Sequence, residues 1–90
     1  MSAKPNDAIY DLFRNYANDV YLYACAALGN SADAHDAVQE VFLRAHRSYD
    51  TFRQDASEKT WLMRIARNYV RDRYRRRQVE QRLIDLGDAV

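Results

Sequence analysis

Apolar residues recur every three to four positions in three stretches of this 90-residue chain. That spacing predicts an α-helix with one apolar face in each stretch. Asn6 or Asp7 is a suitable N-cap for the first helix, and Gly29 supplies a residue able to end it. Its apolar stripe, about six turns long, consists of Ile9, Leu12, Phe13, Tyr16, Ala17, Val20, Tyr23, Ala24, Ala27 and Leu28. Leu22 falls opposite the stripe, either as a harmless exposed leucine or as part of a docking surface.

The second stretch begins after Ser31, which can cap a helix whose first turn carries Asp33. Its core stripe is predicted to contain Ala34, Ala37, Val38, Val41, Phe42, Ala45 and Tyr49. A second stripe, formed by Asp36, Gln39, Glu40 and Leu43, lies on the outward side at helical spacing. The residue types leave two interpretations open: a solvated face with pairs such as Glu40 and Arg44, or an interface that includes Leu43.

Residues 50–56 break the periodicity, and Ser57, or Asp55 with Glu58 as a capping box, can start a third helix. Its buried stripe is predicted to contain Leu62, Ile65, Ala66, Tyr69 and Val70. The opposite side carries Trp61, at the boundary of the core, with Arg64, Asn68, Arg71 and Arg75.

A weaker helical pattern follows Arg77, with Val79, Leu83 and Leu86, and Gly87 is expected to end it. We interpret residues 78–90 as a linker or frayed helical extension, residues 1–8 as a flexible lead-in and 9–77 as the folded domain. Only two glycines and one proline occur in the chain. The predicted fold class is therefore all-α: a small bundle of three main helices with a C-terminal helical extension.

Several function classes lack their characteristic residues. His35 and His46 are eleven positions apart, roughly 16 Å along a helix, which is too far to share a metal ion. The single cysteine, Cys25, cannot form an internal disulfide and is interpreted as a space-filling residue. No catalytic motif is present, so we expect neither an enzyme nor a cofactor or metal site. The sequence has no signal peptide or membrane span, which favours a cytoplasmic protein.

Charge is distributed unevenly along the chain. Residues 1–60 hold six basic and nine acidic side chains, whereas residues 64–77 hold seven arginines and one acid, Asp72. A local charge of +6 beside aromatic residues suits a nucleic acid, because cations follow phosphates and rings stack on unpaired bases. Tyr49, Phe52 and Trp61 flank the break before the basic helix, although each ring could equally be core. Asn68 is the amide on that helix able to read a base edge.

Two adjoining segments resemble a known family. ADAHDAVQEVFLRAHR (32–47) and SYDTFRQDASEKTWLMRIARN (48–68) are similar to region 2 of bacterial sigma factors of the extracytoplasmic-function (ECF) type. The resemblance extends from about Ile9 to Arg77. It implies a domain that binds core RNA polymerase and recognises the minus-ten promoter element during transcription initiation. The separate region 4 of that family is not present in these 90 residues, so the chain is either an isolated region 2 domain or a fragment.

The resemblance also implies roles for individual residues. Asp36, Gln39 and Glu40, with Leu43 beside them, match positions that grip the coiled coil of the polymerase β′ clamp. Phe52, Arg53 and the loop to Ser57 match the segment that, in the family, receives a flipped base of the non-template strand. Arg64, Asn68 and Arg71 match positions that face this strand and the upstream duplex. Trp61 matches an aromatic position of the family, either as a wedge at the DNA or as part of the core.

Three residues depart from the family pattern. Gln54 stands where many members have Gly, and Glu58 stands where a less acidic residue is common, which affects the expected loop conformation and base preference. His35 replaces a frequent acid, which affects the clamp contact.

The sequence thus predicts the promoter-recognition domain of an alternative sigma factor, whose partners are core RNA polymerase, single-stranded promoter DNA and an anti-sigma factor. The alternative is a helical interaction module engaged mainly by an anti-sigma factor, with Leu22 and Leu43 as candidate contacts. Steep loss of affinity with salt would favour the nucleic acid, and a shallow loss an apolar protein interface.

Overall fold

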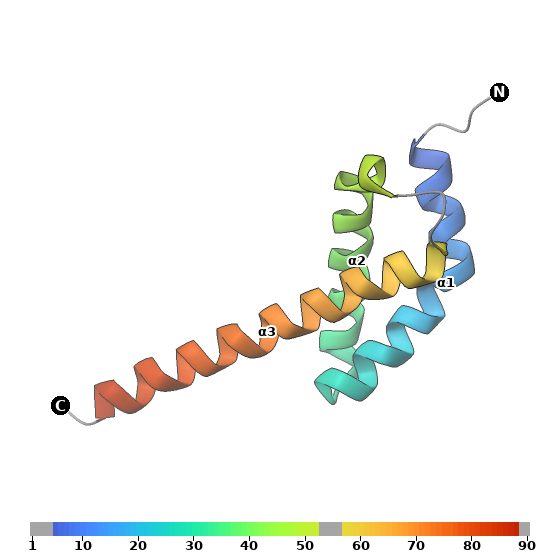
Figure 1. Cartoon of the computed structure of the whole chain (residues 1–90). Helices are drawn as coiled ribbons and strands as arrows, with labels where there is room; N and C mark the ends of the chain where they lie inside the picture. The colour runs from blue at the N-terminus through green and yellow to red at the C-terminus, as the bar shows by residue number, and fades with distance from the viewer. Residues whose placement is uncertain (1–4, 53–56, 89–90) are drawn as a thin grey trace.

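The computed structural model describes residues 5–52 and 57–88, which form three helices and one short turn of 3₁₀-helix. They are α1 (Pro5–Leu28), α2 (Ser31–Arg47), η1 (Tyr49–Thr51) and α3 (Glu58–Asp88). α1 and α2 pack side by side, and α3 crosses both of them before its C-terminal part projects away from the bundle (Figure 1). The all-α bundle predicted from the sequence is confirmed.

The turn between α1 and α2 is built by two consecutive residues. Gly29 has a φ of 82°, a left-handed value that glycine adopts without strain, and its N–H donates to the carbonyl of Cys25 at 2.9 Å. Asn30 then caps α2, because its Oδ1 accepts the N–H of Asp33 at 2.8 Å. The predicted stop at Gly29 is confirmed, whereas the prediction that Ser31 caps α2 is wrong by one residue.

Two predicted helix boundaries also need correction. α1 begins at Pro5, so Asn6 and Asp7 lie in its first turn instead of capping it, and part of the expected lead-in is helical. Proline suits a first helical position because its missing N–H would have no intrahelical partner there. α3 continues to Asp88, so Gly87 lies inside the helix and does not end it.

Ser57 caps α3, in agreement with the first of the two predicted alternatives. Its Oγ accepts the N–H of Thr60 at 2.9 Å, and its carbonyl accepts the N–H of Trp61 at 3.0 Å. Asp55, the other candidate, lies outside the described residues. From this cap α3 runs without interruption for 31 residues, about 46 Å at the usual helical rise.

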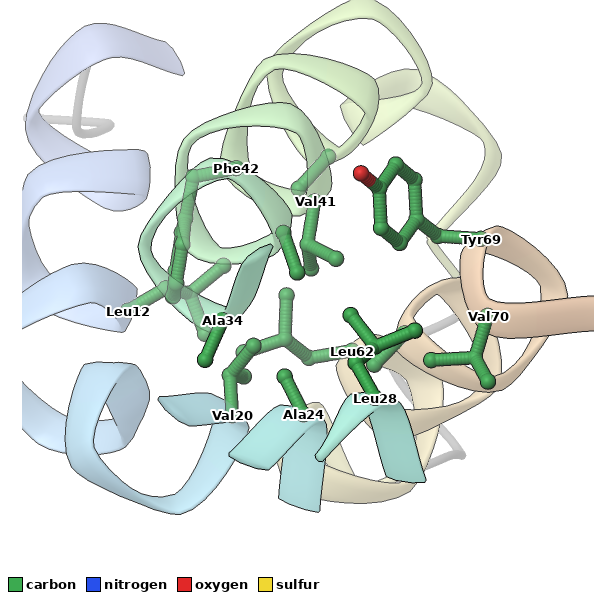
Figure 2. Close-up of a cluster of buried hydrophobic side chains, with 13 residues drawn as sticks. Leu12, Val20, Ala24, Leu28, Ala34, Val41, Phe42, Leu62, Tyr69 and Val70 are labelled. Carbon is green, nitrogen blue, oxygen red and sulfur yellow. The ribbon is translucent and has the colours of Figure 1, made fainter. Parts of the chain in front are cut away.

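The core lies where the three apolar faces meet. Figure 2 shows side chains from all three helices pointing toward one another, with Leu62 of α3 between α1 and α2. The buried residues are Leu12, Val20, Ala24, Leu28, Ala34, Ala37, Val41, Phe42, Ala45, Leu62, Ala66, Tyr69 and Val70. Every one of them belongs to a predicted apolar stripe.

Phe13 is the main exception among the predicted core residues. It is 45% exposed and contacts Phe42 edge-on, with ring centroids 5.2 Å apart. Val38, Tyr49 and Ile65 are half-buried and pack against the core. Leu22 is 57% exposed, as its position opposite the α1 stripe predicts.

The last turns of α3 do not contribute to the core. Val79, Leu83, Ile84 and Leu86 are all more than half exposed. The helix there continues beyond the packing that supports its first half. Over the part of the chain that the structure describes, none of the helices has the length and apolar character needed to span a membrane.

Candidate nucleic-acid interface

Three aromatic rings meet where η1 approaches the start of α3. Phe52 and Trp61 have centroids 5.2 Å apart, and Tyr49 lies 6.2 Å from Phe52 and 6.3 Å from Trp61. We refer to these three residues as the aromatic cluster. The structure therefore brings together the rings that the sequence placed on either side of the break, and all three are half-buried.

A hollow of about 220 Å³ opens beside the aromatic cluster. Its wall combines the rings with residues of α1 and the first turn of α3: Ala8, Asp11, Leu12, Tyr49, Phe52, Glu58 and Trp61. Two carboxylates, Asp11 and Glu58, line this hollow, so a neutral or cationic group suits it better than a phosphate does. A planar base with exposed amino donors matches both the rings and the carboxylates.

The predicted strand-facing residues of α3 lie on one exposed side of the helix. Arg64 and Arg71 are exposed and Asn68 is half-buried between them. Arg71 donates from Nη2 to Oδ1 of Asn68 at 2.9 Å, which fixes the direction of the amide. We refer to Arg64, Asn68 and Arg71 as the basic strip.

Two other predicted site residues, Ser57 and Arg53, are not part of the basic strip. The hydroxyl of Ser57 is used in the cap, because it also donates to Oγ1 of Thr60 at 2.9 Å. A direct contact of this hydroxyl with DNA would compete with the cap. Arg53 and the neighbouring Gln54 lie outside the described residues.

The second predicted surface, which we refer to as the α2 face, is also brought together. Asp36, Gln39, Glu40 and Leu43 line one hollow of about 410 Å³, whose other side is formed by Arg44, Tyr69 and Arg76. Leu43 is 50% exposed, and Asp36 and Gln39 are exposed as well. On its α2 side the hollow thus presents two carboxylates, an amide and one apolar side chain, and two arginines lie on the other side.

Arg44 separates the α2 face from the basic strip. Its guanidinium pairs with Glu40 at 3.5 Å, as predicted, and with Asp72 of α3 at 3.1 Å, and it lies over the ring of Tyr69 at 5.3 Å. Asp72, the single acid of the arginine run, is therefore paired with α2 at the surface of the bundle. No local pattern indicates this contact, because Arg44 and Asp72 are 28 residues apart.

Asp33 makes a second set of contacts that the sequence reasoning missed. Its Oδ1 accepts from Arg73 and its Oδ2 from Arg77, both at 2.9 Å. Arg73 also donates to the hydroxyl of Tyr69 at 3.3 Å. The four-residue spacing of Arg73 and Arg77 indicates a shared helix face, but their common partner is set only by the crossing of α3 over the α1–α2 turn.

The pKa of Asp33 is held below its ordinary value of 3.8. The largest cause is the hydrogen bond from the side chain of Asn30, and Arg73 and Arg77 add to it against the opposing effect of burial. Close by, the hydroxyl of Tyr74 donates to the carbonyl of Ala27. These contacts attach the middle of α3 to the end of α1 and the start of α2.

The remaining candidate groups show no comparable arrangement. Cys25 is half-buried beside Tyr21, whose pKa is raised chiefly by the hydrogen bond between these two side chains. The ring of His35 lies 5.0 Å from that of Tyr21. Among the residues that the structure describes, no group of three or more His, Cys, Asp and Glu side chains could hold a metal ion.

Comparisons with known proteins identify the same family that the sequence resembles. Residues 12–80 match Sigma-70 region 2. The chain is 36% identical over 78 residues to the ECF RNA polymerase sigma factor SigX of Bacillus subtilis, an alignment that covers 86% of this chain and 40% of SigX. It is 38% identical over 72 residues to SigW of the same organism, covering 80% of this chain and 38% of SigW.

A shorter alignment is more similar still. The chain is 53% identical over 38 residues to the ECF RNA polymerase sigma-E factor of Escherichia coli strain K12, covering 42% of this chain and 20% of that protein. The chain spans about two fifths of the length of SigX and SigW. The family match nevertheless covers most of its residues, with the core and the basic strip included. This chain therefore belongs to the sigma-70 region 2 family, and its relatives there are ECF sigma factors.

Proposed function

We propose that the chain is the promoter-recognition domain of an alternative sigma factor acting in the cytoplasm. It binds the β′ clamp of core RNA polymerase through the α2 face and captures the non-template strand of the minus-ten element beside α3. One observation carries this proposal: two chemically different surfaces adjoin each other across Arg44. One offers Asp36, Gln39, Glu40 and Leu43, and the other offers the aromatic cluster and the basic strip.

The mechanism is capture of an opened strand. A base that leaves the duplex loses stacking and pairing, at a cost of a few kcal/mol. The aromatic cluster and its hollow supply replacement contacts, while Arg64 and Arg71 neutralise phosphates. Because these contacts need an unpaired base, they favour the open strand over the duplex. Nothing in this scheme requires the chain to hydrolyse a nucleotide.

Base reading is tested with single-stranded oligonucleotides that carry a minus-ten sequence or an unrelated sequence. Asn68→Ala and Phe52→Ala should weaken binding to the minus-ten strand more than binding to the unrelated strand. Asn18→Ala is the matched control, since Asn18 is an exposed amide on α1. Equal losses on both strands would remove the base-reading role. Circular dichroism monitors whether loss of Phe52 from the aromatic cluster alters the fold.

Polymerase binding is tested by retention of the chain on immobilised core enzyme. Gln39→Ala combined with Glu40→Ala should abolish retention and leave helicity unchanged. The same two residue types occur as Glu80 and Gln81 on the exposed end of α3, so their double alanine variant is the control. Unchanged retention of the first variant would mean that the α2 face is a solvated surface that does not bind the polymerase.

A second candidate function, engagement mainly by an anti-sigma factor, is favoured by the apolar surface. Leu22 and Leu43 are at least half exposed, and Leu43 lines a further hollow of about 440 Å³ with Ile9, Gln39, Phe42 and His46. Binding to such a surface should change little with salt, whereas strand binding should weaken steeply.

A further inference from the structure

A separate hollow of about 300 Å³ lies between the end of α2 and the middle of α3. Its lining combines Arg44, Arg47 and Ser48 with Ile65 and Asn68, and we refer to it as the α2–α3 hollow. Of these residues, only Asn68 belongs to the strand-facing set assigned so far.

Two of the five residues are already committed to the protein. Arg44 is balanced by Glu40 and Asp72, as described above. The hydroxyl of Ser48 donates to the carbonyl of Arg44 at 2.5 Å. Both residues line the hollow, but their side-chain donors already contact other groups of the protein.

Arg47 is available by contrast. It is exposed, and within residues 5–52 and 57–88 its guanidinium takes part in no hydrogen bond or ion pair. No carboxylate of the described residues therefore pairs with its positive charge at the α2–α3 hollow. A guanidinium presents several N–H donors in one plane and has no acceptor.

Asn68 offers donors as well, for a reason set by Arg71. Because arginine can only donate, the amide must turn its oxygen toward Arg71, and the bond of 2.9 Å uses that oxygen. The –NH₂ group is left to donate, and within the described part of the chain it has no acceptor. The free polar groups of the hollow are thus donors, above a partly apolar floor at Ile65.

We propose that the α2–α3 hollow binds a phosphodiester group of the captured DNA strand, with Arg47 as its principal cation and Asn68 as a second donor. A phosphodiester supplies two anionic acceptor oxygens, which match a guanidinium fork. Ser48 directly precedes Tyr49, so the bound phosphate adjoins the aromatic cluster, where a base of the same strand is held. This inference rests on the proposed function and adds an α2 residue to a surface assigned so far to the α2–α3 loop and α3.

The test measures binding of the full chain to a fluorescent minus-ten single strand at a series of salt concentrations. Arg47→Ala should lower affinity about tenfold at low salt and reduce the slope of log K against log[salt] by about 0.7, the contribution of one phosphate on a single strand. Arg47→Lys should restore the slope while leaving part of the affinity loss, because an ammonium cannot bind as a fork. Arg82→Ala, an exposed arginine on the projecting end of α3, is the matched control and should change neither.

A second arm locates the phosphate. It uses a set of strands, each of which carries one neutral methylphosphonate linkage in place of a phosphodiester. At one position of the linkage, the affinity of the wild type should fall, whereas the affinity of Arg47→Ala should stay the same as for the unmodified strand. Two results would overturn this inference alone, provided that the wild type still binds its strand. In one, the affinity losses from the linkage and from Arg47→Ala add at every position; in the other, Arg47→Ala leaves the slope of log K against log[salt] unchanged. Failure of wild type to bind the strand would overturn it together with the proposed function. Competition by inorganic phosphate at micromolar concentration would instead identify a site for the free ion.

Discussion

The two parts of α3 have different surroundings although they form one continuous helix. Up to Arg77 the helix is attached to the bundle by buried side chains such as Leu62 and by the contacts of Arg73 and Arg77 with Asp33. From Gln78 onward every residue whose exposure the structure describes is exposed. Helical propensity carries the chain past the point where packing ends.

The same contrast divides the arginines. Arg73 and Arg77 share the carboxylate of Asp33. Arg75 and Arg76 lie between them in sequence and pair with none of the residues that the structure describes. A helix turns by about 100° per residue, so neighbours in sequence face different ways. Position relative to the bundle, and not residue type, therefore decides whether an arginine holds the fold together or offers its charge to a partner.

The largest expected effect comes from truncating a leucine in each part of α3. Leu62 is fully buried, so Leu62→Ala should lower the free energy of unfolding by about 2 to 5 kcal/mol. Leu83 is 63% exposed, so Leu83→Ala should change it by less than about 0.5 kcal/mol. Urea unfolding followed by circular dichroism measures both. A comparable loss in the second variant would mean that the end of α3 is packed.

A smaller effect should distinguish the two kinds of arginine. Arg73→Ala removes contacts with Asp33 and the hydroxyl of Tyr69, and should lower the Tm by a few degrees. Arg75→Ala, at an exposed position, should leave the Tm within about one degree. Thermal denaturation at low ionic strength gives the comparison. Equal shifts would show that the Asp33 contacts do not contribute to the attachment of α3.

The contrast can be sharpened in strand binding. Arg71→Ala should reduce the salt slope by about 0.7, the loss of one phosphate contact. Arg77→Ala should reduce it less, because Asp33 already balances part of the Arg77 charge. The measurement is the affinity for a single strand between low and moderate salt. A larger change of the salt slope for Arg77→Ala than for Arg71→Ala would mean that Arg77, and not Arg71, is the main phosphate contact.

The smallest expected effect is the pH dependence of the Asp33 contacts. A carboxyl whose pKa is lowered by folding stabilises the native state above its unfolded pKa, and this contribution is lost as pH falls through the lower native pKa. The stability difference between wild type and Asp33→Asn should therefore be constant at neutral pH and shrink as pH falls below about 4. Denaturant midpoints at several pH values measure it. A difference that persists undiminished well below the native pKa would mean that charge at Asp33 is not its source.

Local sequence signals predicted much of this fold. The helical spacing of apolar residues identified all thirteen side chains that are buried in the described part of the chain. The errors lie where two neighbouring residues compete for one role, as with Asn30 and Ser31, or where the element continues without a partner, as at Gly87. Phe13 fits the α1 stripe, but it lies at the margin of the three-helix contact and stays nearly half exposed.

The candidate site was less accessible to sequence reasoning. Spacing alone grouped the α2 face and the basic strip, because their members follow one another on single helices. The pairing of Arg44 with Asp72 and that of Asp33 with Arg77 depend on the angle at which α3 crosses the bundle. That angle is set by packing of all three helices at once, and no short stretch of sequence specifies it.

Arg44 has a further consequence for the two surfaces it separates. It lines both the hollow of the α2 face and the α2–α3 hollow, so a ligand in either one meets the same guanidinium. A partner that draws Glu40 away leaves Asp72 as the carboxylate balancing Arg44, which makes the side facing Asn68 more positive. Binding equilibria are reciprocal: if one ligand changes the affinity for a second ligand by some factor, the second changes the affinity for the first by the same factor. Because Arg44 lines both hollows, a ligand that changes its pairing in one of them alters the charge that a ligand in the other would meet.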